Sequence, residues 1–133
     1  MRFTLALIAV AIFGISCKRG GDPDRMTEAK IHIAGFQSAL DSFDVDCGRY
    51  PTTVEGLPAL VASPPSVPNR VWHGPYLDKV ARDPWGHDYI YLCPGVHNTN
   101  QFDVYSRGPD GVSRSGGDDA DDINNWSRKI KYN

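Results

Sequence analysis

One stretch of the chain, residues 22–48, limits the possible folds more than any other because its pattern predicts a long amphipathic helix. Asp22 and Pro23 are typical of a helix start, since aspartate caps the first free N–H groups and proline suits the first helical position. Gly48 is the expected end, so that about 24 residues span about 36 Å. Apolar residues recur at alternating steps of three and four, which aligns them on one side of the helix: Met26, Ala29, Ile33, Phe36, Leu40 and Phe43. This side is expected to be the core face of a domain.

Two short strand patterns follow in the second half of the chain. Residues 83–95, DPWGHDYIYLCPG, indicate a turn that leads into a strand whose alternate residues are aromatic or apolar. Residues 102–106, FDVYS, indicate a second strand. One helix followed by a small antiparallel sheet predicts an α+β fold.

The composition suits one globular domain with an appendage and argues against a nucleic-acid partner. The 133 residues carry a formal net charge of −2, with Lys and Arg scattered along the chain, whereas phosphate binding needs a basic face. No catalytic motif is present either, because the four histidines form no H-E-x-x-H pair and no G-x-S-x-G precedes a helix. The sequence therefore predicts a protein that is not an enzyme.

The first 17 residues resemble an export signal. After Met1 and Arg2, an uncharged run extends from Phe3 to Ser16. This run is shorter than the roughly 20 residues that span a membrane and matches the roughly 7–15 of a secretory signal. It stops at Cys17, which indicates a lipoprotein signal, with a plain signal peptide and an anchor helix as the alternatives. Each of these would place the domain in the cell envelope, on the periplasmic side of a membrane.

Export affects how the remaining cysteines are interpreted. If Cys17 carries lipid, Cys47 and Cys93 form an even pair in an oxidising compartment, so a disulfide between them is possible. Two buried, unpaired thiols are the alternative, because the sequence does not show whether the Cβ atoms come within about 4 Å of each other.

Four segments are expected along the chain. Residues 1–17 are the signal peptide or membrane anchor, residues 18–23 are a linker, residues 24–126 form the globular domain, and residues 127–133 are a C-terminal tail.

Carboxylates crowd a glycine-rich stretch near the C-terminus. It holds the following of the chain's 16 acidic residues: Asp103, Asp110, Asp118, Asp119, Asp121 and Asp122. Arg107 and Arg114 are the bases among them. Oxygen ligands suit a hard cation, and Ca²⁺ accepts six to eight oxygens at about 2.4 Å with flexible geometry, whereas Mg²⁺ requires a stricter octahedron. Calcium is the better match, and a solvated acidic loop is the alternative.

Several motifs, in this order, resemble a known family. They are AKIHIAGFQSALDSFDVDCGRYPTTVEGLPALV at 29–61, then DPWGHDYIY, then FDVYSRGPDG, and DDADDINNW at 118–126. Together they resemble the major pseudopilin, the G subunit, of the type II secretion system. The resemblance implies a long N-terminal helix on a three- or four-stranded antiparallel sheet. It also implies subunits that polymerise with other pseudopilins and inner-membrane components into a periplasmic pseudopilus, which pushes folded proteins through the outer membrane.

The same resemblance implies a set of calcium ligands in the C-terminal loop. The side chains are those of Asp110, Asp121 and Asp122, and the backbone carbonyls are those of Arg107 and Val112.

The N-terminus departs from the family pattern of a basic leader that ends in glycine, a phenylalanine and, four residues later, an acid. Arg2 stands at the place of the glycine, Leu7 stands at the place of the acid, and the apolar run ends at Cys17. A second function therefore stays open, that of a lipid-anchored periplasmic binding or scaffold module that keeps the pseudopilin fold without polymerising.

Overall fold

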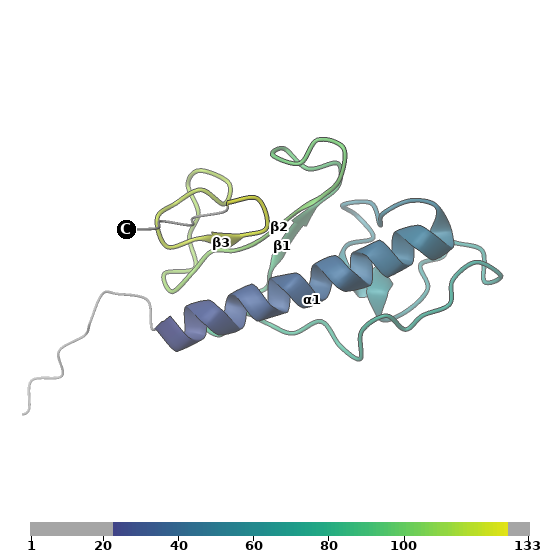
Figure 1. Ribbon diagram of the computed structural model, residues 1–133, viewed down its shortest axis with the longest axis horizontal. Helices are drawn as coiled ribbons and strands as arrows, with labels where there is room; N and C mark the ends of the chain where they lie inside the picture. The colour runs from purple at the N-terminus through teal and green to yellow at the C-terminus, as the bar shows by residue number, and fades with distance from the viewer. Residues whose placement is uncertain (1–22, 128–133) are drawn as a thin grey trace, which may run out of the picture.

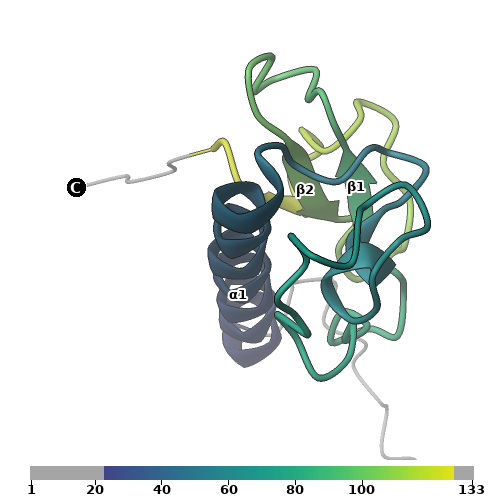
Figure 2. The same ribbon diagram turned by 90° about the vertical axis from the view of Figure 1, so that its right-hand side faces the viewer.

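The computed structural model describes residues 23–127 as one long helix packed along a three-stranded antiparallel sheet (Figure 1). The elements in chain order are helix α1 (Pro23–Cys47), the short 3₁₀ helix η1 (Leu57–Leu60), and strands β1 (Ile90–Leu92), β2 (Asp103–Ser106) and β3 (Ile123–Asn124). This arrangement confirms the α+β prediction. The sheet and most of the loops lie on one side of α1, which is evident when the molecule is viewed along the helix (Figure 2).

Helix α1 begins and ends where its sequence pattern predicts. It starts at Pro23 and ends at Cys47, and Gly48 has a positive φ of 74° while its N–H donates to the carbonyl of Asp44 at 2.7 Å. The left-handed φ closes the last turn at low steric cost because glycine has no Cβ. Met26 is only half-buried, and the fully buried residues are Ala29, Ile33, Phe36, Ala39, Leu40 and Phe43.

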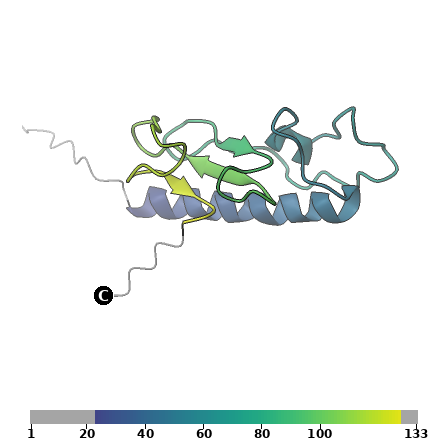
Figure 3. The same cartoon turned by 90° about the horizontal axis from the view of Figure 1, so that it is seen from above.

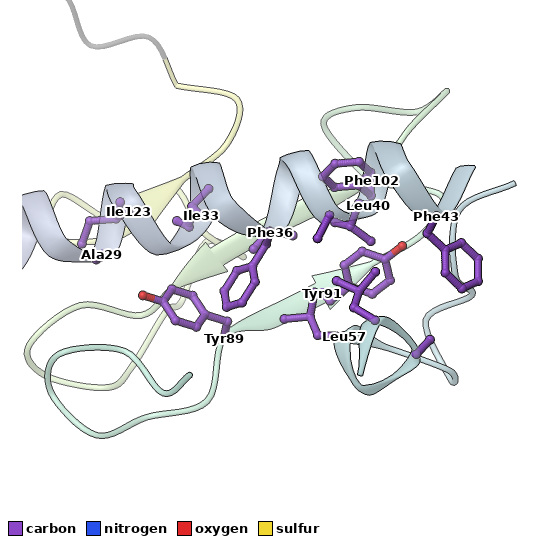
Figure 4. Close-up of a cluster of buried hydrophobic side chains, with 14 of the residues drawn as sticks. Ala29, Ile33, Phe36, Leu40, Phe43, Leu57, Tyr89, Tyr91, Phe102 and Ile123 are labelled. Atoms are coloured by element: carbon purple, nitrogen blue, oxygen red, sulfur yellow. The ribbon is translucent and has the colours of Figure 1, made fainter. Parts of the chain in front are cut away.

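The buried side of α1 meets two different partners along its length. Near its start, Ala29 and Ile33 lie beside Ile123 of β3, and farther along Phe36 packs edge-on against Tyr89 with ring centroids 5.0 Å apart (Figure 4). Toward its end, the helix is covered by the segment that contains η1. Each fully buried large apolar side chain contributes about 1.5–3 kcal/mol relative to exposure, so this one helix face carries much of the core.

Strand β2 is central in the sheet, with β1 and β3 antiparallel on either side (Figure 3). Tyr91 of β1 lies opposite Val104, and Ser106 lies opposite Ile123 of β3. All four residues of β2 are buried, so both of its faces are covered. The register of β2 and β3 brings the loops beyond Ser106 and before Ile123 together at one end of the sheet.

The family resemblance implied three or four strands, and the structure has three, but the strand patterns in the sequence located only two of them. Strand β3 was missed because it has only two residues, too few to show an alternating pattern. Its pairing is continued by the side chain of Asn125. The N–H of Val104 donates to Oδ1 of Asn125 at 2.9 Å, and Nδ2 of Asn125 donates to the carbonyl of Phe102 at 3.1 Å. A side-chain amide thus takes the place of a peptide group beside β2.

Between Pro23 and Ser127, no helix is long and apolar enough to cross a membrane. The N-terminal residues on which the export prediction depends, among them Leu7 and Cys17, lie outside the described residues.

A bidentate ion pair between Arg49 and Glu55 stabilises the loop that follows α1. Nη1 of Arg49 donates to Oε2 of Glu55 at 2.7 Å and Nη2 donates to Oε1 at 2.8 Å, while the N–H of Thr52 donates to Oε2 at 2.8 Å. The hydrogen bonds from Arg49 are the main cause that lowers the pKa of Glu55 from 4.5 to about 2. The ionised form of Glu55 is therefore favoured by folding, and this contribution is present above pH 4.5 and lost as the pH falls toward 2.

Replacing Glu55 with glutamine is expected to lower the free energy of unfolding at pH 7 by about 1 kcal/mol, since the Arg49 side chain is 38% exposed and solvent screens the pair. Urea unfolding should show this difference from the wild type shrinking as the pH is lowered from 4.5 toward 2. Glu28→Gln is the matched control, because the Glu28 side chain is 56% exposed and its contact with His32 is long at 3.9 Å. A difference that stays constant over this pH range would contradict the assignment.

Candidate metal-binding loop

Two turns meet at the end of the sheet where β2 ends and β3 begins. The N–H of Gly111 donates to the carbonyl of Gly108 at 3.2 Å, and the N–H of Asp122 donates to that of Asp119 at 3.0 Å. Gly108 has a φ of 65°, and a Cβ at this position would lie only 2.2 Å from the carbonyl oxygen of Asp121. Glycine is therefore required at residue 108, because the two turns are in direct backbone contact.

Asp122 is the buried acid at the base of these turns. Its Oδ2 accepts from Oγ of Ser113 at 2.6 Å and from the N–H of Asp119 at 2.9 Å. Its Oδ1 is also buried but has no hydrogen-bond partner among residues 23–127. Burial raises the pKa of Asp122, and the negative charges of Asp119 and Asp121 raise it further. A carboxylate oxygen in this position is poorly satisfied, and a cation would supply both a ligand bond and an opposite charge.

The other two predicted carboxylates are placed differently. Asp121 is half-buried, and its Oδ2 lies near Gly108, at 3.3 Å from the position of a Cβ there. Asp110 is exposed, and its Oδ1 accepts from the N–H of Val112 at 2.9 Å within its own turn. In the part of the chain that the structure describes, no three His, Cys, Asp or Glu side chains converge as a metal-binding group. A cation here would need backbone carbonyls as well, which is the role predicted for Arg107 and Val112, and calcium accepts such ligands.

Arg107 is the unusual member of the predicted set. Within residues 23–127, its Nε is buried and has no hydrogen-bond partner. Because the predicted contribution of Arg107 is its carbonyl, the side chain is not required to bind.

Two aspartates of the acidic stretch have other partners in the structure and are not part of the candidate metal site. Asp103 is almost fully buried in β2 and accepts N–H groups of the loop between β1 and β2, and Asp118 faces His97 and Trp126. The density of acids along the sequence therefore overstates the charge that a metal would need to neutralise.

Ser113 is a residue of the candidate site that the sequence did not reveal. Its Oγ donates to Asp122 and accepts the N–H of Gly117 at 2.7 Å, so it connects the buried acid to the backbone of the loop. A serine in a glycine-rich loop is a common signal for such side-chain to backbone bonds, but it does not identify the acid that the serine will meet.

Cys47 and Cys93 are free, half-buried thiols in the described part of the chain. Sγ of Cys93 donates to the carbonyl of Gln101 at 3.6 Å. Burial raises the pKa of the Cys47 thiol, an effect that a hydrogen bond with Tyr76 partly offsets. The disulfide between the two cysteines stays a prediction.

The relationship to known proteins agrees with this architecture. A family model described as type II secretion system (T2SS), protein G, matches residues 19–126. The chain belongs to this family. The type II secretion system core protein G of Klebsiella pneumoniae is 40% identical to this pseudopilin over 111 residues, which are 80% of the chain and 75% of the relative. The core protein G of Pseudomonas aeruginosa is 44% identical over 108 residues, or 79% and 73% of the two chains.

A solved structure supports the same assignment. The pseudopilin resembles the crystal structure of the major pseudopilin from the type 2 secretion system of enterohaemorrhagic Escherichia coli, with a TM-score of 0.65 and 32% identity. The match covers 91% of this chain and 98% of that one. The protein is thus a major pseudopilin subunit of a type II secretion system, a structural protein of the cell envelope rather than an enzyme.

Proposed function

We propose that this pseudopilin is a calcium-stabilised subunit that assembles with copies of itself, other pseudopilins and inner-membrane components into the periplasmic pseudopilus. In this role it supports the export of folded proteins across the outer membrane. The single observation that favours calcium is the buried Oδ1 of Asp122, which lacks a partner among residues 23–127 while Asp119 and Asp121 add negative charge.

The carboxylates of Asp110, Asp121 and Asp122 would hold the ion together with the carbonyls of Arg107 and Val112. When bound, the ion supplies positive charge that offsets the repulsion between neighbouring carboxylates. The ligands come from the turn after β2 and the turn before β3, so the ion would join the two turns. Because this ligand arrangement exists only in the folded chain, binding would stabilise the native state by mass action.

The sequence of the N-terminus favours a second candidate function. Leu7 replaces the acid that pseudopilins place near the mature N-terminus, and Cys17 follows a short apolar run. These features favour a lipid-anchored binding or scaffold module that keeps the fold and does not polymerise.

The mature N-terminus distinguishes the two functions. If Cys17 is lipidated, mass spectrometry of the protein from its native host should find a diacylglyceryl group on Cys17. The Cys17→Ser variant should then leave the membrane fraction or stay unprocessed, because a thiol is required for lipid transfer. Cys47→Ser is the matched control and should fractionate as the wild type does. A mature chain that begins with methyl-phenylalanine, together with unchanged processing of Cys17→Ser, would instead establish an ordinary filament subunit.

A further inference from the structure

His97 lies between two carboxylates, outside the proposed calcium ligands. Its Nδ1 is 3.1 Å from Oδ2 of Asp103, and its Nε2 is 2.9 Å from Oδ2 of Asp118. One face of the imidazole stacks on Trp126, with ring centroids 4.0 Å apart and an interplanar angle of 6°. Asp103 lies in β2, and Asp118 and Trp126 lie before and after β3 in the C-terminal loop, here residues 107–127. His97 belongs to the loop between β1 and β2, so one side chain connects three segments.

Asp103 is a fixed and ionised partner in this cluster. It is 1% exposed and accepts three backbone hydrogen bonds, from the N–H groups of Val96, His97 and Asn98 at 2.7–2.9 Å. Burial alone would raise the pKa of Asp103, but the hydrogen bonds from His97 and Asn98 outweigh it and hold the pKa below its usual value. The carboxylate therefore anchors the loop between β1 and β2 and presents a negative oxygen to the His97 ring.

Trp126 stacks on the His97 ring and also contacts two other residues, Asp118 and Tyr105. Its Nε1 donates to Oδ1 of Asp118 at 2.9 Å, and its ring packs edge-on against Tyr105 at 5.8 Å. Gly117 has a φ of 105°, and a Cβ there would lie 2.5 Å from the indole ring. The indole is thus flanked by His97, Tyr105 and the loop backbone at Gly117, and Trp126 is half-buried.

The two contacts of the ring require a particular protonation state. A neutral imidazole has one N–H, so one ring nitrogen would direct its lone pair at a carboxylate oxygen about 3 Å away. The imidazolium donates at both nitrogens, and its charge interacts favourably with the face of the indole. Within residues 23–127, Asp103 from β2 and Asp118 from the C-terminal loop are the charged groups that face the ring, and Trp126 is uncharged.

We propose that His97, as the imidazolium, is a pH-dependent latch that fastens the C-terminal loop to the loop between β1 and β2 and weakens as the pH rises.

The direction of the pH dependence follows from the change in proton affinity on folding. Burial disfavours the charged ring, but the hydrogen bonds to Asp103 and Asp118 and their negative charges outweigh it, so the pKa of His97 lies above its ordinary value of 6.5. A raised pKa in the folded state means that the stabilisation is fully present below pH 6.5 and is lost as the pH rises through the folded-state pKa. The loop is therefore held most firmly under mildly acidic conditions.

The latch is tested by thermal unfolding between pH 5.5 and 9 in the presence of chelator, so that the result does not depend on calcium. The wild type should lose roughly 4–8 °C more over this range than His97→Gln, the shift expected in a small domain when one charge-assisted contact is lost. His73→Gln is the matched control, because His73 has a side chain 67% exposed and only a 3.6 Å contact with Asp46. This control should keep the pH dependence of the wild type.

A second measurement keeps the test decisive if His97→Gln does not fold. The ring of His97, followed by NMR, should titrate at higher pH in the folded protein than in urea, and Asp118→Asn should move its midpoint back toward the urea value. The proposal is overturned if His97 titrates at the same pH in folded and unfolded protein, or if His97→Gln folds and keeps the full pH dependence of the wild type.

Discussion

Removing calcium is expected to lower the melting temperature of the wild-type pseudopilin by roughly 10–20 °C. A ligand present at 100 times its dissociation constant stabilises the native state by about 2.7 kcal/mol, and each kcal/mol corresponds to about 4–8 °C in a domain of this size. The physical source is the buried Asp122 carboxylate. Its Oδ1 has no hydrogen-bond partner among residues 23–127, and the nearby acids Asp119 and Asp121 add negative charge. The comparison is between calcium and chelator at constant pH and ionic strength.

The variant Asp121→Ala plus Asp122→Ala should melt at one temperature with calcium and with chelator, since two of the three carboxylate ligands are gone. Asp78→Ala plus Asp88→Ala removes the same charge from two exposed positions and should keep the calcium response of the wild type. If the wild type and both variants show the same melting temperatures with and without calcium, no structural calcium site exists here.

Replacing Phe43 with alanine is expected to cost about 3–5 kcal/mol of stability, because truncating a buried aromatic residue leaves a cavity in the core. Phe43 is 0% exposed near the end of α1, and its ring packs edge-on against Tyr76 with centroids 5.8 Å apart. The loss approaches the entire stability of many small domains, about 5–15 kcal/mol, so a measurable unfolded fraction is expected at 37 °C.

Val45→Ala is the matched control for this core substitution, as Val45 lies in the same helix but is 83% exposed. Its effect should stay within about 0.5 kcal/mol of the wild type. Urea unfolding followed by circular dichroism measures both. A cost below about 1 kcal/mol for Phe43→Ala would contradict the central place of α1 in the core.

The long helix was predictable because its information is local. A cap, a proline, a terminal glycine and a stripe with helical spacing define α1 without reference to the rest of the chain. Strand β3 was not predictable in this way. Its two residues have no pattern of their own, and they form a strand only because β2 and the side chain of Asn125 offer partners.

The same contrast applies to the candidate site. The acidic composition and the family resemblance both pointed to Asp121 and Asp122, which lie in the turn before β3. The composition alone also grouped Asp103 and Asp118 with these acids, although neither of the two acts with them. Asp103 bonds to backbone N–H groups that are near in sequence, whereas its partnership with Asp118 runs through His97, 21 residues away from Asp118. Contacts of this kind depend on the folded sheet, and charge counting along the chain cannot separate paired acids from unpaired ones.

Calorimetric titration of calcium into the folded protein is the most direct test of the proposal that this pseudopilin is stabilised by calcium. The account predicts one bound ion per chain in the wild type and no binding to the Asp121→Ala plus Asp122→Ala variant, measured at a temperature where circular dichroism shows both to be folded. Absence of binding to the wild type at millimolar calcium, or equal binding to the wild type and the variant, would contradict it.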